Sequence, residues 1–158
     1  MKQSRKDDLI QAQMRPGVIT RDGLLGDDTR ALRDIIEADE AAVNRLGLSH
    51  VTLAARLREL RAAGARGLGD TVTVEGTFEI SVDATRGRLP CPFGHPGLYP
   101  NEVVTVRNIQ LDETLTFTRL NIHLIASHGF YEGVGSPYRL DPTTLARVLG
   151  CGVHQDPG

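Results

Sequence analysis

The chain has 158 residues, of which 40% are hydrophobic and 24% charged, and this composition fits a globular domain with a core of its own. A formal net charge of −2 argues against bulk electrostatic binding to nucleic acids or membranes, although a local basic face stays possible. Aromatic residues make up 4% and tryptophan is absent, so we expect an aliphatic core.

We expect residues 1–158 to form a single domain with disordered tails at 1–10 and 151–158. No apolar run approaches the ~20 residues that span a bilayer, and the first residues lack the apolar stretch of a secretion signal. The sequence therefore predicts a cytoplasmic protein without membrane contact. In that compartment, Cys91 and Cys151 are expected to be reduced thiols or metal ligands rather than a disulfide.

Two helices are predicted in the first half of the chain from apolar residues at helical spacing. The first extends from a cap at Asp27 or Asp28 to a stop at Gly47. The second is capped by Ser49 and ends in the glycine-rich stretch 64–69.

Alternating apolar residues then predict two antiparallel hairpins. The first joins residues 72–74 to 78–82, and the second joins 103–106 to 114–117. Residues 83–102, between the hairpins, are rich in glycine and proline and are expected to lack regular structure.

Two further helices are predicted after the second hairpin. One covers residues 119–128, with Thr118 as its cap and Gly129 as its stop, and a short one is capped by Asp141 and ended by Gly150. This order of elements predicts an α+β fold in which two antiparallel β-hairpins form a small sheet with about four helices.

Cysteine and histidine residues flank the second hairpin. Cys91 and His95 precede it, and His123 and His128 lie on the helix that follows it. Thiolate and imidazole are ligands that zinc prefers, and four of them close a structural site. We therefore predict a metal site, with zinc as the expected ion. A five-residue spacing separates the two helical histidines by ~140°, so the last turn is expected to distort.

This order of a ligand pair, two strands and a helical histidine pair resembles the two-Cys, two-His zinc finger, a ββα module. The resemblance implies a structural zinc ion. In this chain His95 stands where that family has its second cysteine.

Two alternatives remain for the same residues. In one, Cys91, His123 and His128 form a three-ligand site with an open position, where a metal ion activates water and Glu132 is the nearest base in sequence. In the other there is no metal: His128 is a core histidine, His123 a surface residue and Cys91 a buried thiol.

Residues 42–64 carry a second pattern. The Leu-Gly-Leu-Ser turn, the apolar positions after it and the Ala-Ala-Gly exit resemble the reading element of winged helix-turn-helix bacterial regulators, and a hairpin follows where a wing would lie. The resemblance implies contacts to bases from His50, Thr52 and Arg56, and contacts to phosphates from Arg58, Arg61 and Arg66. The plain alternative is a pair of packed helices with a solvated arginine face.

The leading interpretation is a small metal-binding protein that acts through a binding surface. A DNA-binding regulator and a small metal-dependent enzyme are the alternatives. The partner is left open between DNA and another protein, including a second copy of the chain.

Overall fold

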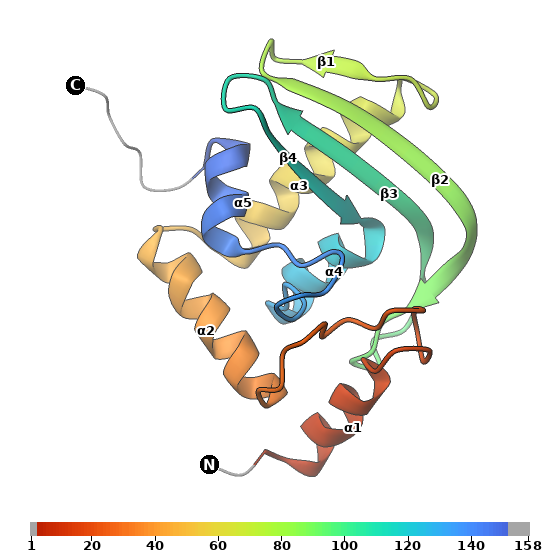
Figure 1. Ribbon diagram of the computed structural model, residues 1–158, viewed down its shortest axis with the longest axis vertical. Helices are drawn as coiled ribbons and strands as arrows, with labels where there is room; N and C mark the ends of the chain where they lie inside the picture. The colour runs from red at the N-terminus through yellow and green to blue at the C-terminus, as the bar shows by residue number, and fades with distance from the viewer. Residues whose placement is uncertain (1–2, 152–158) are drawn as a thin grey trace.

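A four-stranded antiparallel sheet forms one side of the protein, and helices pack against it (Figure 1). The computed structural model describes residues 3–151. Within that range the elements are α1 (Arg5–Gln13), α2 (Leu32–Arg45), α3 (His50–Ala65), β1 (Val72–Val74), β2 (Phe78–Pro90), β3 (Leu98–Asn108), β4 (Glu113–Thr118), α4 (Arg119–His128) and α5 (Pro142–Leu149). The predicted α+β class is confirmed, with five helices in the described residues where about four were expected.

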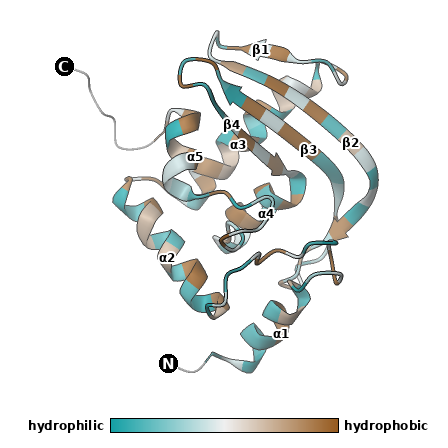
Figure 2. Cartoon of the chain, viewed as in Figure 1, coloured by the Kyte–Doolittle hydropathy of each residue, from teal (hydrophilic) through white to brown (hydrophobic). Residues whose placement is uncertain are grey.

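The strands follow one another in the order β1-β2-β3-β4, each antiparallel to the next. The two predicted hairpins are therefore β1–β2 and β3–β4, and the pairing of β2 with β3 joins them into one sheet. Buried and more exposed residues alternate along β3, and Figure 2 shows the same alternation in hydropathy. Helices α3, α4 and α5 pack against the sheet, so its apolar face forms the main core.

The segment 83–102 differs from the prediction, because most of it is strand. β2 continues to Pro90 and β3 begins at Leu98, which leaves only residues 91–97 as the connecting loop. The pairing slips between Ala84 and Arg88, and this irregularity accommodates the glycine-containing stretch without ending the ladder. The extension matters because it carries the 91–97 loop away from the hairpin and towards α4.

The N-terminal segment also differs from the prediction. Residues 5–10, expected in a disordered tail, belong to α1, and Ser4 caps this helix by accepting a hydrogen bond from the backbone N–H of Asp7. Ile10 and Met14 are buried in a second apolar cluster, which also contains residues of α2 and α4. This contact gives a largely polar segment a reason to be helical.

α2 begins at Leu32, with Ala31 at its N-cap, and not after Asp27 or Asp28 as predicted. Asp28 is used differently: it pairs with Arg30 and accepts a hydrogen bond from the backbone N–H of Val134. The remaining predicted caps are confirmed, namely Ser49 for α3, Thr118 and Gly129 for α4, and Asp141 and Gly150 for α5.

No helix among residues 3–151 is long and apolar enough to cross a membrane. The expected C-terminal tail lies outside the described residues from position 152 onwards.

Candidate metal centre

The 91–97 loop folds against the C-terminal half of α4 and brings a cysteine to two histidines. The Sγ atom of Cys91 lies 3.5 Å from Nε2 of His128. One ligand atom from each of Cys91, His123 and His128 can be chosen so that all three lie within 4.8 Å of one another. The structure therefore contains a Cys/His/His group close enough to hold a metal ion.

α4 fixes the positions of both histidines. A capping box sets the start of the helix: the side chain of Thr118 accepts from the backbone N–H of Asn121, and the Asn121 side chain accepts from that of Thr118. Gly129 ends the helix in the left-handed conformation, at φ +61°. The helix is α-helical through His128, so the expected distortion of its last turn is absent. The side chains of His123 and His128 are long enough to bring their imidazole rings together without such a distortion, and the ring centroids lie 5.3 Å apart.

His95, the fourth predicted ligand, lies at the exposed edge of the same cluster. Its Nδ1 is 3.2 Å from Nε2 of His123, and its ring centroid is 5.5 Å from that of His128. All four predicted residues are thus brought together, with Cys91, His123 and the half-buried His128 forming the tighter group and the exposed His95 beside them.

Three further side chains hold the imidazole rings, and the sequence reasoning missed them. Phe93 stacks on His128 with ring centroids 4.1 Å apart, and Tyr99 stacks on His123 at 4.4 Å. The hydroxyl of Ser127 lies 3.4 Å from Nδ1 of His123, which leaves Nε2 of that ring facing the cluster. Of the three, only Ser127 could have been found from the sequence, because it follows His123 by four residues on the same helix and side chains at that spacing are neighbours.

Burial sets the protonation of the cluster. It lowers the pKa of His128 to about 4, with His123 and His95 adding to the effect, and it lowers the pKa of His123 in the same way. Both rings are therefore neutral near pH 7, which is the form that binds metal ions.

The Cys91 thiol is subject to opposing influences. Burial, the larger one, raises its pKa, whereas hydrogen bonds from the backbone N–H groups of Phe93 and His95 lower it. These two N–H groups are arranged to stabilise a thiolate once a cation is present. A bound metal ion would then displace the proton from the sulfur.

A groove of about 190 Å³ between α3 and α4 adjoins His123. Three arginines line it: Arg58, Arg61 and Arg119. The buried carboxylate of Glu102 accepts two hydrogen bonds from Arg61, at 2.6 and 3.0 Å, and lies 3.9 Å from Arg119. Three guanidinium groups and this one carboxylate leave the groove positively charged.

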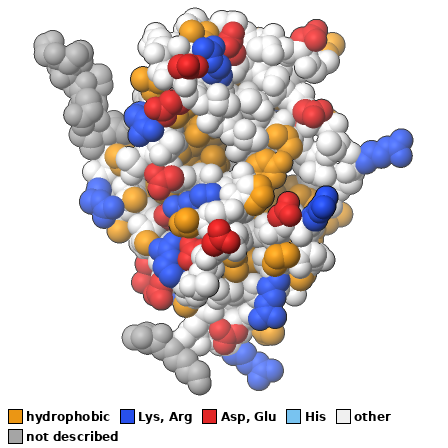
Figure 3. All heavy atoms as spheres, in the orientation of Figure 1, with side chains coloured by type: hydrophobic (Ala, Val, Ile, Leu, Met, Phe, Trp, Pro, Cys, Tyr) orange, Lys and Arg blue, Asp and Glu red, His pale blue; other side chains and the backbone are white. Residues whose placement is uncertain are grey.

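Most residues that the helix-turn-helix resemblance assigns to DNA have partners within the protein. His50 Nδ1 lies 2.8 Å from the hydroxyl of Tyr131, and Arg56 pairs with Glu59 and Glu75. Arg61 pairs with Glu102, and the hydroxyl of Thr52 lies 2.8 Å from that of Ser49. Arg58 is exposed and lines the groove between α3 and α4. Figure 3 shows acidic and basic side chains interspersed on the face it presents. DNA binding stays a prediction.

Glu132, the base expected for an open metal site, lies in a hydrogen-bond network separate from the Cys/His cluster. Its carboxyl group accepts hydrogen bonds from Asn121 and Ser136, and the residue lines a different cavity from the groove beside His123.

A scan against protein-family models finds no match for this chain, and searches of curated proteins and of solved structures find none either.

Proposed function

We propose that the protein binds one divalent transition-metal ion, zinc by its ligand chemistry, through Cys91, His123 and His128, with His95 as the fourth ligand. The observation that carries the proposal is the convergence of one thiol and two neutral imidazoles within 4.8 Å on the 91–97 loop and α4. A thiolate with imidazoles is a donor set typical of zinc, and it excludes the hard cations calcium and magnesium.

Two interatomic distances support the four-ligand version. Typical bond lengths in a tetrahedral zinc site place a sulfur and a nitrogen ligand about 3.6 Å apart and two nitrogen ligands about 3.3 Å apart. The Cys91 Sγ to His128 Nε2 distance is 3.5 Å, and the His95 Nδ1 to His123 Nε2 distance is 3.2 Å. The two pairs already have the spacing of ligands, and a small approach of one pair to the other would complete the site.

The ion would have a structural role at this position. It would tie the loop between the two longest strands to the helix that carries His123 and His128. Residues 94–98 of this loop region are exposed, and Gly94 and Gly97 have positive φ angles, so the segment has little core of its own. Coordination would replace the missing packing.

The experiment uses the full chain purified without chelators. Elemental analysis should find about one equivalent of zinc, and cobalt added to the stripped protein should give the near-ultraviolet charge-transfer absorption of a cobalt–thiolate bond. The Cys91→Ser variant should lose that absorption. The matched control is Cys151→Ser, which removes the other cysteine, at the end of α5. Less than ~0.2 equivalents of bound metal in the unaltered protein, or a cobalt–thiolate band that survives Cys91→Ser, would contradict the proposal.

A second candidate keeps Cys91, His123 and His128 as ligands but leaves the fourth position to water. It is favoured by the exposure of His95 and by the three arginines of the groove that adjoins His123, which would suit an anionic substrate. A His95→Gln variant separates the two: it weakens metal binding in the closed site and leaves it nearly unchanged in the open one.

A further inference from the structure

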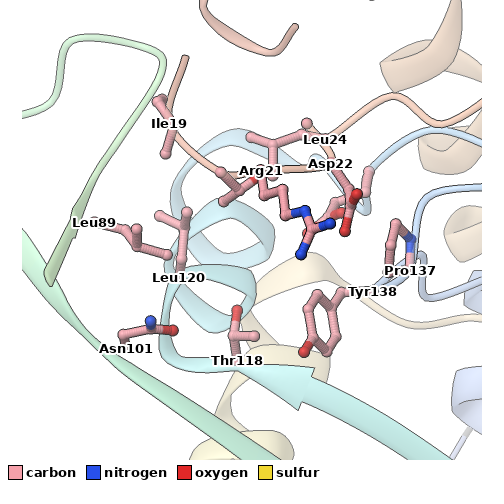
Figure 4. Close-up of a pocket in the computed structure, with 13 residues that line it drawn as sticks. Ile19, Arg21, Asp22, Leu24, Leu89, Asn101, Thr118, Leu120, Pro137 and Tyr138 are labelled. Carbon is pink, nitrogen blue, oxygen red and sulfur yellow. The ribbon is translucent and has the colours of Figure 1, made fainter. Parts of the chain in front are cut away.

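A second cavity, of about 310 Å³, lies between the 19–24 segment, the start of α4 and the 132–138 loop (Figure 4). A sphere of that volume is about 8 Å across, so groups on opposite walls can reach one small molecule. Its walls include none of the proposed metal ligands. The cavity is therefore a site of its own.

A carboxyl group on the wall of this cavity has no cationic partner. Glu132 is only 2% exposed, and its two carboxyl oxygens accept from Asn121 Nδ2 at 2.6 Å and Ser136 Oγ at 2.5 Å. No ion pair found among residues 3–151 involves this side chain. A buried carboxylate without a cation is costly, so a cationic group on an occupant would be stabilised here.

The nearest arginine in sequence does not supply that cation. Arg139 donates to the backbone carbonyl of Glu132 at 2.8 Å, and its guanidinium pairs with Asp39 at 2.5 and 2.9 Å. Burial raises the pKa of the Glu132 carboxyl to about 7, although the hydrogen bonds from Ser136 and Asn121 and the charge of Arg139 act to lower it. The backbone at Glu132 is also in the left-handed region, at φ +68°, and such strain in a non-glycine residue is often found at binding sites.

Three consecutive polar residues also line the walls: Thr20, Arg21 and Asp22. The hydroxyl oxygen of Thr20 is buried and has no hydrogen-bond partner in the described part of the chain. Arg21 and Asp22 are exposed, and neither is in an ion pair found within residues 3–151. Figure 4 shows the guanidinium of Arg21 beside the ring of Tyr138. The cavity thus offers an anion inside, and both a cation, Arg21, and a second anion, Asp22, near its opening.

The remaining wall is apolar, with Ile19, Leu24, Leu89 and Leu120 along it. These four side chains would exclude water from an aliphatic or aromatic group of the occupant. A ligand that matches all walls has an ammonium group, a carboxylate and an apolar side chain.

We propose that this cavity binds a free amino acid with an apolar side chain. The ammonium group donates to the Glu132 carboxylate. The carboxylate pairs with Arg21, and the side chain packs against Leu24 and Leu120. The proposal is independent of metal binding.

The test is calorimetric titration of the full chain with L-leucine, L-isoleucine, L-valine, L-methionine and L-phenylalanine at about pH 8, where Glu132 is ionised. At least one should bind with a dissociation constant of about 1 mM or tighter. Removing the carboxylate, as in 3-methylbutylamine, or the ammonium group, as in 4-methylpentanoate, should weaken the binding of a leucine-type ligand by about tenfold or more. No binding of any of the five up to ~10 mM, or equal binding of the amine, would overturn the proposal.

Variants connect the binding to this cavity. Arg21→Gln should weaken the binding of the amino acid by about tenfold, whereas the control variant Arg66→Gln, at an exposed arginine, should leave the binding unchanged. Glu132→Gln should abolish binding; should that variant fail to fold, Ile19→Trp, which fills the cavity from its partly exposed edge, should abolish it instead. Binding that persists unchanged in Arg21→Gln and Ile19→Trp would place the amino acid elsewhere and overturn the assignment.

Discussion

Helix α4 serves two polar sites of opposite character. On one side, His123 and His128 meet Cys91, and their nitrogen and sulfur atoms have mainly one another as partners. Near its N-terminus, Asn121 donates to the buried carboxyl of Glu132, whose two oxygens are both hydrogen-bonded. The first site has thiol and imidazole atoms ready for a cation, and the second has a carboxyl group beside a cavity whose two hydrogen-bond donors, Asn121 and Ser136, are both neutral. Burial alone therefore does not tell what a polar cluster does; the identity and charge of the partners that its atoms have or lack do.

Because of burial, His128 and Glu132 make the stability of the folded protein depend on pH in opposite directions. The folded-state pKa of His128, about 4, lies below the ordinary 6.5, so this histidine costs stability as pH falls through that interval. The folded-state pKa of Glu132, about 7, lies above the ordinary 4.5, so this carboxyl costs stability as pH rises from 4.5 to 7.

The largest expected effect is on metal affinity in the His128→Gln variant. Removing a direct ligand should weaken zinc binding by about a thousandfold, more than the 10–100-fold typical of an outer-shell partner. A competition titration with a chromophoric chelator measures it. The control is His50→Gln, at a histidine bonded to Tyr131 instead. A loss of less than about tenfold in His128→Gln would remove this residue from the ligand set.

The second effect tests whether Glu132 makes the folded protein less stable as pH rises, which is the opposite of the pH dependence expected from His128. In the metal-free protein, Glu132→Gln should remove a stability loss of up to roughly 3 kcal/mol that develops as pH rises from about 5 to 8. Urea unfolding of the variant and the unaltered protein at each pH gives the difference, in which the histidine contributions cancel. Parallel pH profiles would show that the carboxyl has an ordinary pKa and that the two sites do not differ in this respect.

Metal binding should itself stabilise the fold. Zinc at a hundred times its dissociation constant contributes ~2.7 kcal/mol, which raises the melting temperature of a chain of this length by roughly 5–10 °C. Thermal unfolding with zinc and with excess chelator measures the shift. The Cys91→Ser variant should show almost none of it, and an equal shift in that variant would mean that the ion binds at another place.

The smallest effect concerns the partner of a ligand. Ser127→Ala removes the hydroxyl 3.4 Å from Nδ1 of His123 and should weaken zinc binding by about tenfold. The control is Ser81→Ala, on β2 and outside the cluster. A thousandfold loss in Ser127→Ala would indicate that the serine is itself a ligand or that the site collapses without it.

The sequence predicted the parts of the fold that depend on local signals. Ser49, Thr118 and Asp141 each begin a helix where they were expected to, because a side-chain cap acts on backbone groups a few residues away. α1 was missed because its helicity depends on the burial of Ile10 and Met14 in a cluster that includes α2, a contact that composition does not reveal.

The extension of β2 and β3 through 83–102 was missed for a related reason. Residues 83–88 are mostly exposed, so no alternation of apolar and polar side chains marks them as strand. Their pairing comes from backbone hydrogen bonds continued from the core of the sheet. The gathering of Cys91, His95, His123 and His128 was predicted from residue type and from their places on either side of the second hairpin. The stacking of Phe93 and Tyr99 depended on the path of the unpredicted extension.

X-ray absorption spectroscopy of the zinc-loaded protein tests the central claim most directly. A closed site of Cys91, His95, His123 and His128 predicts one sulfur ligand at ~2.3 Å and three nitrogen ligands at ~2.0–2.1 Å, with the sulfur lost in Cys91→Ser and retained in Cys151→Ser. A first shell made only of nitrogen and oxygen in the unaltered protein would contradict it, because the thiol of Cys91 would then not be a ligand.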